Sequence, residues 1–336
     1  MKYVPKVLRR PIRLLRALPQ LHFRIYRRGY TDTHGQPLPI AVRFLKTLRE
    51  TSPHVLMFGD SVSLRVAHQD SDRRTLGHMV SAAMVPKQVQ VTSFTSYTSY
   101  MHAAFIALAN RLQARPEWVV LPYNLRCTSP QWDGCPVWQY TQENAVVQAL
   151  ITDPAPQPGA VAPVFLDNKV YDSVAFSSPL SAWRSVGPFR KLARNKPTDP
   201  TLGRERLRQL LVLHYGQPVT RQHRQIVFLC SAIREAASLG AQVLVYVTPI
   251  NVDFMRELWG DELLSIVEHN CNVVRTAIEE AGLSDKVIFE DWSAALRADE
   301  FFHAQETTEH LAQQGRLRLA SLIVETTRIG TAEAAQ

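Results

Sequence analysis

The chain alternates short apolar segments with longer helical patterns, and this alternation constrains its fold more than any other feature. Five segments have the length and the β-branched or aromatic content of buried strands. They cover residues 54–58, 88–94, 117–122, 242–248 and 286–290. Helical patterns occur at residues 41–50, 99–114, 221–239, 261–281 and 311–328. Strands joined by helices of this length form right-handed βαβ crossovers, so the sequence predicts a parallel sheet with helices on both faces.

One long stretch, residues 127–215, interrupts the alternation. It is rich in Pro, Trp and Ser and has helical patterns only at 139–150 and 201–214. Because it is too long for a loop between a strand and a helix, we interpret it as a cap-like insertion at one end of the sheet. The expected organisation is therefore a basic N-terminal arm and linker over 1–40, one α/β domain over 41–330 and a tail over 331–336.

The net charge of +8 is concentrated at the N-terminus. Residues 1–28 hold nine Lys or Arg residues and no acid, which leaves 29 basic and 30 acidic residues elsewhere. A neutral body argues against nucleic-acid binding and directs attention to the arm. Its apolar residues fall near helical spacing opposite arginines, which suits a helix on an anionic membrane surface. The alternative is an arm that packs on the body or contacts a partner.

The same N-terminal residues bear on location. Arginines interrupt every apolar run there, so no secretory signal is expected, and no run in the chain reaches the length of about 18 apolar residues that a spanning helix needs. The four cysteines, Cys127, Cys135, Cys230 and Cys271, form no CxxC pair. We therefore expect a cytoplasmic protein with reduced thiols. The protein is either free in the cytoplasm or held at a membrane through its N-terminal arm. No metal or cofactor is expected.

The first strand is followed by a candidate nucleophile. Gly59 and Asp60 end the apolar segment, and Ser61 opens a helical pattern that can continue to Ala67. A strand, a turn and a helix start place the Ser61 hydroxyl at the carboxyl end of the strand, beside the free N–H groups of the first helical turn. That position suits a nucleophile, although an ordinary turn with an N-cap serine has the same pattern.

Polar residues follow the other strands as well. Ser96 follows the second strand and Asn124 the third. Asn251 follows the fourth, and His310 lies just before the last helix. Ligands of open parallel sheets bind beyond the carboxyl ends of the strands. An imidazole can take the proton of a serine nucleophile, and N–H groups can hold an oxyanion, so these residues supply the components of acyl transfer.

Gly59-Asp60-Ser61, an asparagine after the third strand and a histidine before the final helix resemble the sequence blocks of the SGNH (GDSL-type) hydrolases. The resemblance covers most of residues 54–328, apart from the insertion. It implies a flavodoxin-like three-layer α/β sandwich of the SGNH-hydrolase type, with a central parallel sheet of about five strands. It also implies that Ser61 is the nucleophile, that His310 is the base, and that Ser61, Ser96 and Asn124 form the oxyanion hole.

The chain departs from the family pattern in each of the later blocks. Ser96 stands where the family has a glycine, and the flanks of Asn124 differ. The family places an aspartate three residues before its histidine, where this chain has Thr307. Either Glu306 takes the role of that aspartate, or the site works as a Ser–His dyad, or catalysis has been lost.

These residues predict a serine-dependent ester hydrolase that forms an acyl-enzyme on Ser61. An O-acyltransferase that modifies a glycan uses the same intermediate and is equally compatible. The alternative from another class is a non-catalytic binding or scaffold protein of this fold. By analogy with the family, the expected substrate is an acylated small molecule or a glycan. Arg126, Asn251 and Trp132 are additional candidates for binding it.

Overall fold

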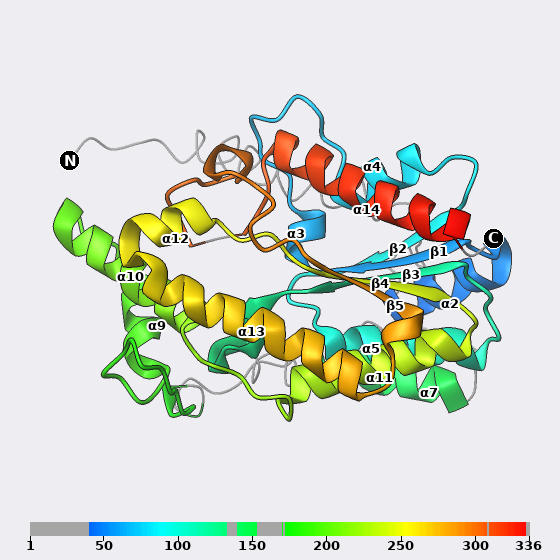
Figure 1. Ribbon diagram of the computed structural model, residues 1–336, viewed down its shortest axis with the longest axis horizontal. Coiled ribbons are helices and arrows are strands. Elements are labelled where there is room, and N and C mark those ends of the chain that lie inside the picture. Colours follow the sequence, from blue (N-terminus) through cyan, green and yellow to red (C-terminus); the bar gives the residue numbers. More distant parts are fainter. Residues whose placement is uncertain (1–39, 133–139, 153–169, 171, 308, 334–336) are drawn as a thin grey trace, which may run out of the picture.

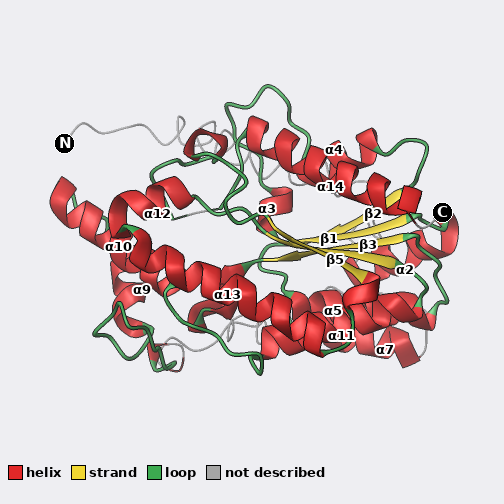
Figure 2. Ribbon diagram, viewed as in Figure 1, coloured by secondary structure: helices red, strands yellow, loops and turns green. Residues whose placement is uncertain are grey.

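A five-stranded parallel sheet lies at the centre of the molecule, with helices on both faces (Figure 1, Figure 2). The computed structural model describes residues 40–132, 140–152, 170, 172–307 and 309–333. The strands are β1 (Val55–Gly59), β2 (Val89–Ser93), β3 (Trp118–Tyr123), β4 (Gln242–Val247) and β5 (Val287–Asp291). Their order, β2-β1-β3-β4-β5, is that of flavodoxin-like sheets. The predicted three-layer sandwich and all five predicted strands are confirmed.

The central strands are buried on both faces, which explains their nearly continuous apolar sequences. In β1, Leu56 and Phe58 belong to the larger of two apolar cores, while Val55 and Met57 belong to the smaller one. The register pairs Val55 with Val89 of β2 and with Trp118 of β3. Because all strands run in the same direction, the residues that follow β1 and β3 emerge at one edge of the sheet.

Two helical layers cover the sheet. The larger core lies between the sheet and four helices, α2 (Ile40–Thr51), α5 (Ser99–Arg111), α11 (Arg224–Ser238) and α13 (Asp261–Glu280). The smaller core lies under α4 (Leu76–Ala83) and α14 (Gln313–Glu333), which are above the sheet in Figure 1. Among the helices described, none has the length and apolarity that crossing a bilayer requires.

The stretch predicted to be an insertion contributes helices in two places. α7 (Thr141–Thr152) packs against α5 and α2, in the helical layer over the larger core. α9 (Gly187–Arg194) and α10 (Pro200–Tyr215) lie near α12 (Val252–Trp259), toward the carboxyl ends of the strands (Figure 1). The helical patterns predicted there agree with α7 and α10 within two residues. The division into domains stays a prediction, and the basic arm lies outside the described residues.

The helix that follows Ser61 is shorter than predicted. α3 (Ser61–Leu64) ends at Leu64, so its predicted continuation to Ala67 is wrong. The backbone beyond it is bonded to side chains instead: Asp70 Oδ2 accepts from Ala67 N at 3.2 Å, and Arg73 Nη1 donates to Ala67 O at 2.7 Å. Such side-chain bonds compete with the hydrogen bonds of a helix. Residues 65–75 therefore form a polar loop.

Candidate active site

Ser61 is the first residue of α3, and its neighbours hold it there. Asp60 caps the helix, because its Oδ1 accepts from Val62 N at 2.8 Å. Gly59 ends β1 where a side chain has no room: a Cβ would lie 2.3 Å from Ser63 Oγ and 2.5 Å from Ser93 Oγ. This close packing places the partly exposed Ser61 at the carboxyl end of β1, as the sequence predicts.

Asn124 lies directly after β3, buried, and it connects two carboxylates. Its Nδ2 donates to Asp60 Oδ2 at 2.8 Å and to Glu309 Oε2 at 2.7 Å. Its Oδ1 accepts from Arg126 N at 3.0 Å. Since an amide nitrogen has two hydrogens, both donors of Asn124 are engaged. The predicted oxyanion donor therefore joins the residue before Ser61 to the residue before His310.

His310 lies in a segment that is pinned by backbone bonds. Its carbonyl accepts from Phe302 N at 2.7 Å, and Leu311 forms an antiparallel bridge with Phe301. Burial lowers the pKa of His310 to about 4, and the charges of Arg65 and Arg126 contribute to the shift. The imidazole is therefore uncharged at neutral pH and can accept a proton. In the described part of the chain, no hydrogen bond joins it to Ser61.

Glu306, the predicted partner of His310, faces another residue. Its Oε1 lies 3.9 Å from Lys196 Nζ, and the two side chains are 39% and 73% exposed. No hydrogen bond between Glu306 and His310 occurs among the described residues. Thr307, at the position of the family's aspartate, is buried. Among the residues that the structure describes, the imidazole has no carboxylate partner.

Glu309 is the acid that enters the site. It is 3% exposed, and its Oε1 accepts the hydroxyl hydrogen of Tyr215, the last residue of α10. Arg126 Nη1 lies 3.8 Å from its Oε2. Burial raises the pKa of both Glu309 and Asp60, while the bonds from Asn124 and the charge of Arg126 act in the opposite direction. Two buried carboxyl groups thus share one amide and one nearby cation.

Ser96 adopts the backbone conformation that favours glycine. It has φ of +64° in the turn closed by a 3.2 Å bond from Tyr97 N to Phe94 O. A residue with a Cβ is strained in this region, and glycine is not. The N–H groups of Ser96 and Ser61 have no hydrogen-bond partner among the described residues. Ser96 therefore adopts a backbone conformation that a glycine would adopt without strain.

The strain at Ser96 gives a testable expectation. Ser96→Val should lower the free energy of unfolding by about 1–2 kcal/mol, because a β-branched residue is disfavoured at positive φ. Ser96→Gly should not lower it by more than about 1 kcal/mol, the usual entropic cost of a glycine. Urea denaturation measures both variants. Equal losses would show that the hydroxyl group, and not the backbone, matters at this position.

The three candidates for substrate binding all have protein contacts. The Arg126 guanidinium lies over the Trp132 ring at 5.0 Å, besides its contact with Glu309. Asn251 caps α12 through Oδ1, which accepts from Phe254 N at 3.1 Å. Its Nδ2 donates to Ala304 O at 2.8 Å, so Asn251 holds the loop that leads to His310.

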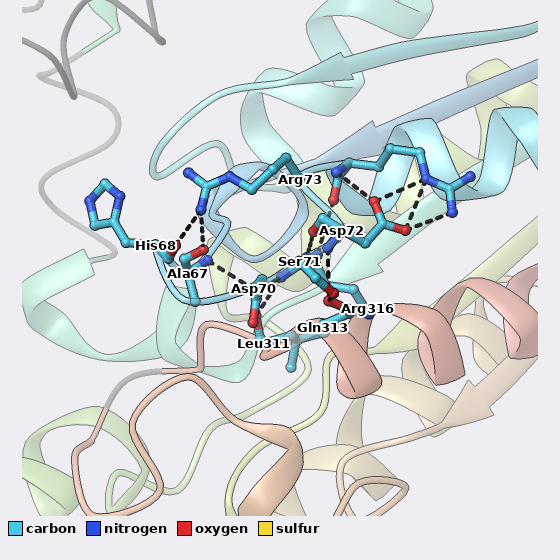
Figure 3. Close-up of polar contacts among 10 residues, drawn as sticks. Ala67, His68, Asp70, Ser71, Asp72, Arg73, Leu311, Gln313 and Arg316 are labelled. Carbon is cyan, nitrogen blue, oxygen red and sulfur yellow. Dashed lines mark hydrogen bonds and ion pairs between the residues drawn. The ribbon is translucent and has the colours of Figure 1, made fainter.

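A second polar network ties the loop after α3 to the start of α14 (Figure 3). Arg316 is fully buried, and its Nη1 donates to Asp70 Oδ2 at 2.6 Å and to Leu311 O at 3.1 Å. Its Nη2 donates to Asp72 O at 2.8 Å. Gln313 Oε1 accepts from Ser71 Oγ and from Asp72 N, both at 2.9 Å. The loop that follows Ser61 is therefore fixed to the segment that follows His310.

The structure thus joins Asn124 to the residues directly before Ser61 and His310 in one network and leaves Glu306 outside it. Tyr215, Glu309 and the Arg316–Asp70 pair are not among the site residues that the sequence predicts. The position of Glu309, directly before the candidate base, was a visible signal. No local pattern marks Tyr215, because it lies 94 residues from Glu309 in the chain.

Comparison with known proteins gives structural matches alone. No family profile matches the chain, and no curated protein sequence matches it. A catalytic mutant of Axe2, an acetylxylan esterase from Geobacillus stearothermophilus, aligns at 13% identity over 81% of this chain and 93% of its own, with a TM-score of 0.40. LAE5, an alpha/beta hydrolase from the metagenome of Lake Arreo, aligns at 12% identity over 81% of this chain and 94% of its own, with a TM-score of 0.35.

Proposed function

We propose that the chain is a serine-dependent ester hydrolase in which Ser61 is the nucleophile and His310 the base. One observation carries the proposal: the Asn124 amide joins Asp60, directly before Ser61, to Glu309, directly before His310. The residues directly before the two candidate groups therefore belong to one buried network at the carboxyl ends of β1 and β3. Ligands bind at this edge in sheets of this type.

The reaction follows from these groups. His310 takes the proton of Ser61 while Ser61 Oγ forms a bond to the ester carbonyl carbon. The N–H groups of Ser61 and Ser96 are the proposed donors to the resulting oxyanion. His310 returns the proton to the leaving alkoxide as the carbon–oxygen bond breaks, which gives an alcohol and an acyl-enzyme. Water, deprotonated by His310, then attacks the acyl carbon. The bond from this carbon to Ser61 Oγ breaks, His310 returns the proton to Ser61 Oγ, and the acid is released.

Asn124 and Glu306 have conditional roles in this proposal. Asn124 can donate to the oxyanion once one of its two carboxylate partners releases it. Glu306 can orient His310 if its carboxylate exchanges Lys196 for the imidazole, and without this exchange the site is a Ser–His dyad. The proposed substrate is an acylated small molecule or glycan, and a sugar hydroxyl in place of water would make the same site an O-acyltransferase.

Covalent labelling tests the nucleophile. A fluorophosphonate probe should form a bond between Ser61 Oγ and phosphorus, with loss of fluoride, and peptide mass spectrometry should locate the adduct on Ser61. Ser61→Ala should give no adduct. Ser63→Ala is the matched control two residues away, and it should be labelled like the wild type. An adduct that persists in Ser61→Ala would show that Ser61 is not the nucleophile.

A non-catalytic binding protein is the second candidate. Two observations on the described residues favour it. No hydrogen bond joins Ser61 to His310, and no carboxylate is bonded to the imidazole. A folded wild-type protein that gives neither an adduct nor hydrolysis of 4-nitrophenyl acetate would support it over the hydrolase.

A further inference from the structure

We propose that Glu309 is a positioning residue of the Ser61–His310 site, and that it connects Tyr215 of α10 to Asn124. The inference rests on the proposed function and adds a residue that the family pattern does not supply. The acid that supports the site is then Glu309, the residue next to His310, and it acts through the main chain and through Asn124.

The surroundings of Glu309 hold its carboxylate in one orientation. Each oxygen has its own donor: Oε1 accepts from the Tyr215 hydroxyl, and Oε2 accepts from Asn124 Nδ2 at 2.7 Å. The Arg126 guanidinium lies 3.8 Å away. A buried carboxylate with two donors and a nearby cation is strongly oriented, because charge-assisted bonds are strong and the local dielectric constant is low.

The position of the His310 ring depends on this anchor. Within the described chain, the imidazole makes no hydrogen bond, so its place is set by its backbone and by packing. The main chain is fixed after His310 by the bridge of Leu311 to Phe301, and at His310 itself by the bond from Phe302 N. Before His310, the fixed point is the Glu309 side chain. In the family, an acid bonded to the ring would supply this restraint directly.

The same carboxylate orients the nucleophile through Asn124. The second hydrogen of Asn124 Nδ2 goes to Asp60 Oδ2, and Asp60 Oδ1 caps the first turn of α3 through Val62 N. A continuous chain of hydrogen bonds thus runs from Tyr215 through Glu309, Asn124 and Asp60 to the helix that begins at Ser61. A shift of Glu309 would displace both groups that react with the substrate.

Kinetics of folded variants test this role. Glu309→Ala should lower kcat for 4-nitrophenyl acetate by about 100-fold with little change in KM, since small misplacements of reacting groups cost this much. Glu309→Gln should recover to within about tenfold of the wild type, because its carbonyl and amide can still bond Asn124 and Tyr215. Tyr215→Phe removes one bond and should lower kcat by about two- to tenfold.

A matched control separates positioning from general stability. Glu300 is also a buried glutamate, and its carboxylate accepts from Arg297 N at 2.8 Å in the same loop region. Glu300→Gln should change the thermal midpoint without changing kcat. A loss of kcat in Glu300→Gln as large as that in Glu309→Ala, or an unchanged kcat in folded Glu309→Ala, would overturn the proposal. If Glu309→Ala does not fold, an unchanged kcat in Tyr215→Phe would overturn it.

A measurement independent of activity distinguishes this inference from the proposed function. Absence of any adduct on the wild-type protein would refute the hydrolase. The NMR titration of the His310 ring would then still decide the role of Glu309. Loss of the anchor in Glu309→Ala or Tyr215→Phe should move the pKa of His310 from about 4 toward the ordinary value of an exposed histidine. An unchanged titration in folded variants would refute the positioning role.

Discussion

His310→Ala is expected to lower kcat/KM for 4-nitrophenyl acetate by about 100- to 10,000-fold, the range that a general base contributes. The imidazole is uncharged at neutral pH, and it is the base proposed to take the proton of Ser61. Steady-state kinetics on the purified variant measure the loss. His303→Ala, which removes an exposed histidine of the same loop, is the control and should retain the wild-type rate. Equal rates in the two variants would contradict the assignment of His310.

The pH dependence of the same reaction identifies the base. Because burial and nearby arginine charges lower the pKa of His310 to about 4, the acidic limb of kcat/KM should lie near pH 4. A limb near 6.5, the ordinary histidine value, would show that another group titrates.

Folding must be followed in parallel by circular dichroism. His102 is fully buried and also has its pKa lowered to about 4. Between pH 6.5 and 4 the unfolded chain binds more protons at both histidines, so their contribution to stability is complete above pH 6.5 and is lost as the pH falls toward 4.

Arg316→Met is expected to lower the free energy of unfolding by about 3–5 kcal/mol, the usual cost of breaking a buried ion pair on one side. Arg316 has no exposed surface, and the side chain of Asp70 is only 8% exposed. The substitution leaves the Asp70 carboxylate unpaired and also frees the carbonyls of Asp72 and Leu311. Urea denaturation measures the loss.

Two further variants show whether pairing explains the effect. Arg318 is 51% exposed and pairs with Glu300, so Arg318→Met should cost less than about 1 kcal/mol. Adding Asp70→Asn to Arg316→Met should recover part of the loss, because the unpaired charge is removed. A loss in Arg316→Met no larger than that in Arg318→Met would mean that the buried pair does not stabilise the fold.

The strands and the candidate nucleophile could be predicted because their signals are local. Burial on both faces makes residues 55–58 an unbroken apolar run, and Gly59-Asp60 marks its end. The end of α3 could not be predicted, since residues 61–67 have a helical pattern and the competing bonds come from Asp70 and Arg73. The hydrogen bonds of these side chains to the backbone of Ala67 outweigh the local preference for a helix.

The partners of the site illustrate the same limit. The family's acid on that side of the histidine predicts a role for Glu306, but the turn at 303–306 directs the Glu306 carboxylate to Lys196. Glu309 is oriented by Tyr215, whose position depends on how α10 packs. Contacts between residues so far apart in the chain follow from the tertiary arrangement and have no signature in spacing.

The narrow space at Gly59 has a consequence for sequence variation. Ser63 Oγ and Ser93 Oγ, from α3 and β2, both lie closer to the site of a Cβ at residue 59 than two atoms can pack. A side chain at residue 59 would therefore require smaller residues at positions 63 and 93 or a shift of the helix that carries Ser61. The three positions are thus coupled in volume, and their substitutions should be tolerated as sets and not one at a time.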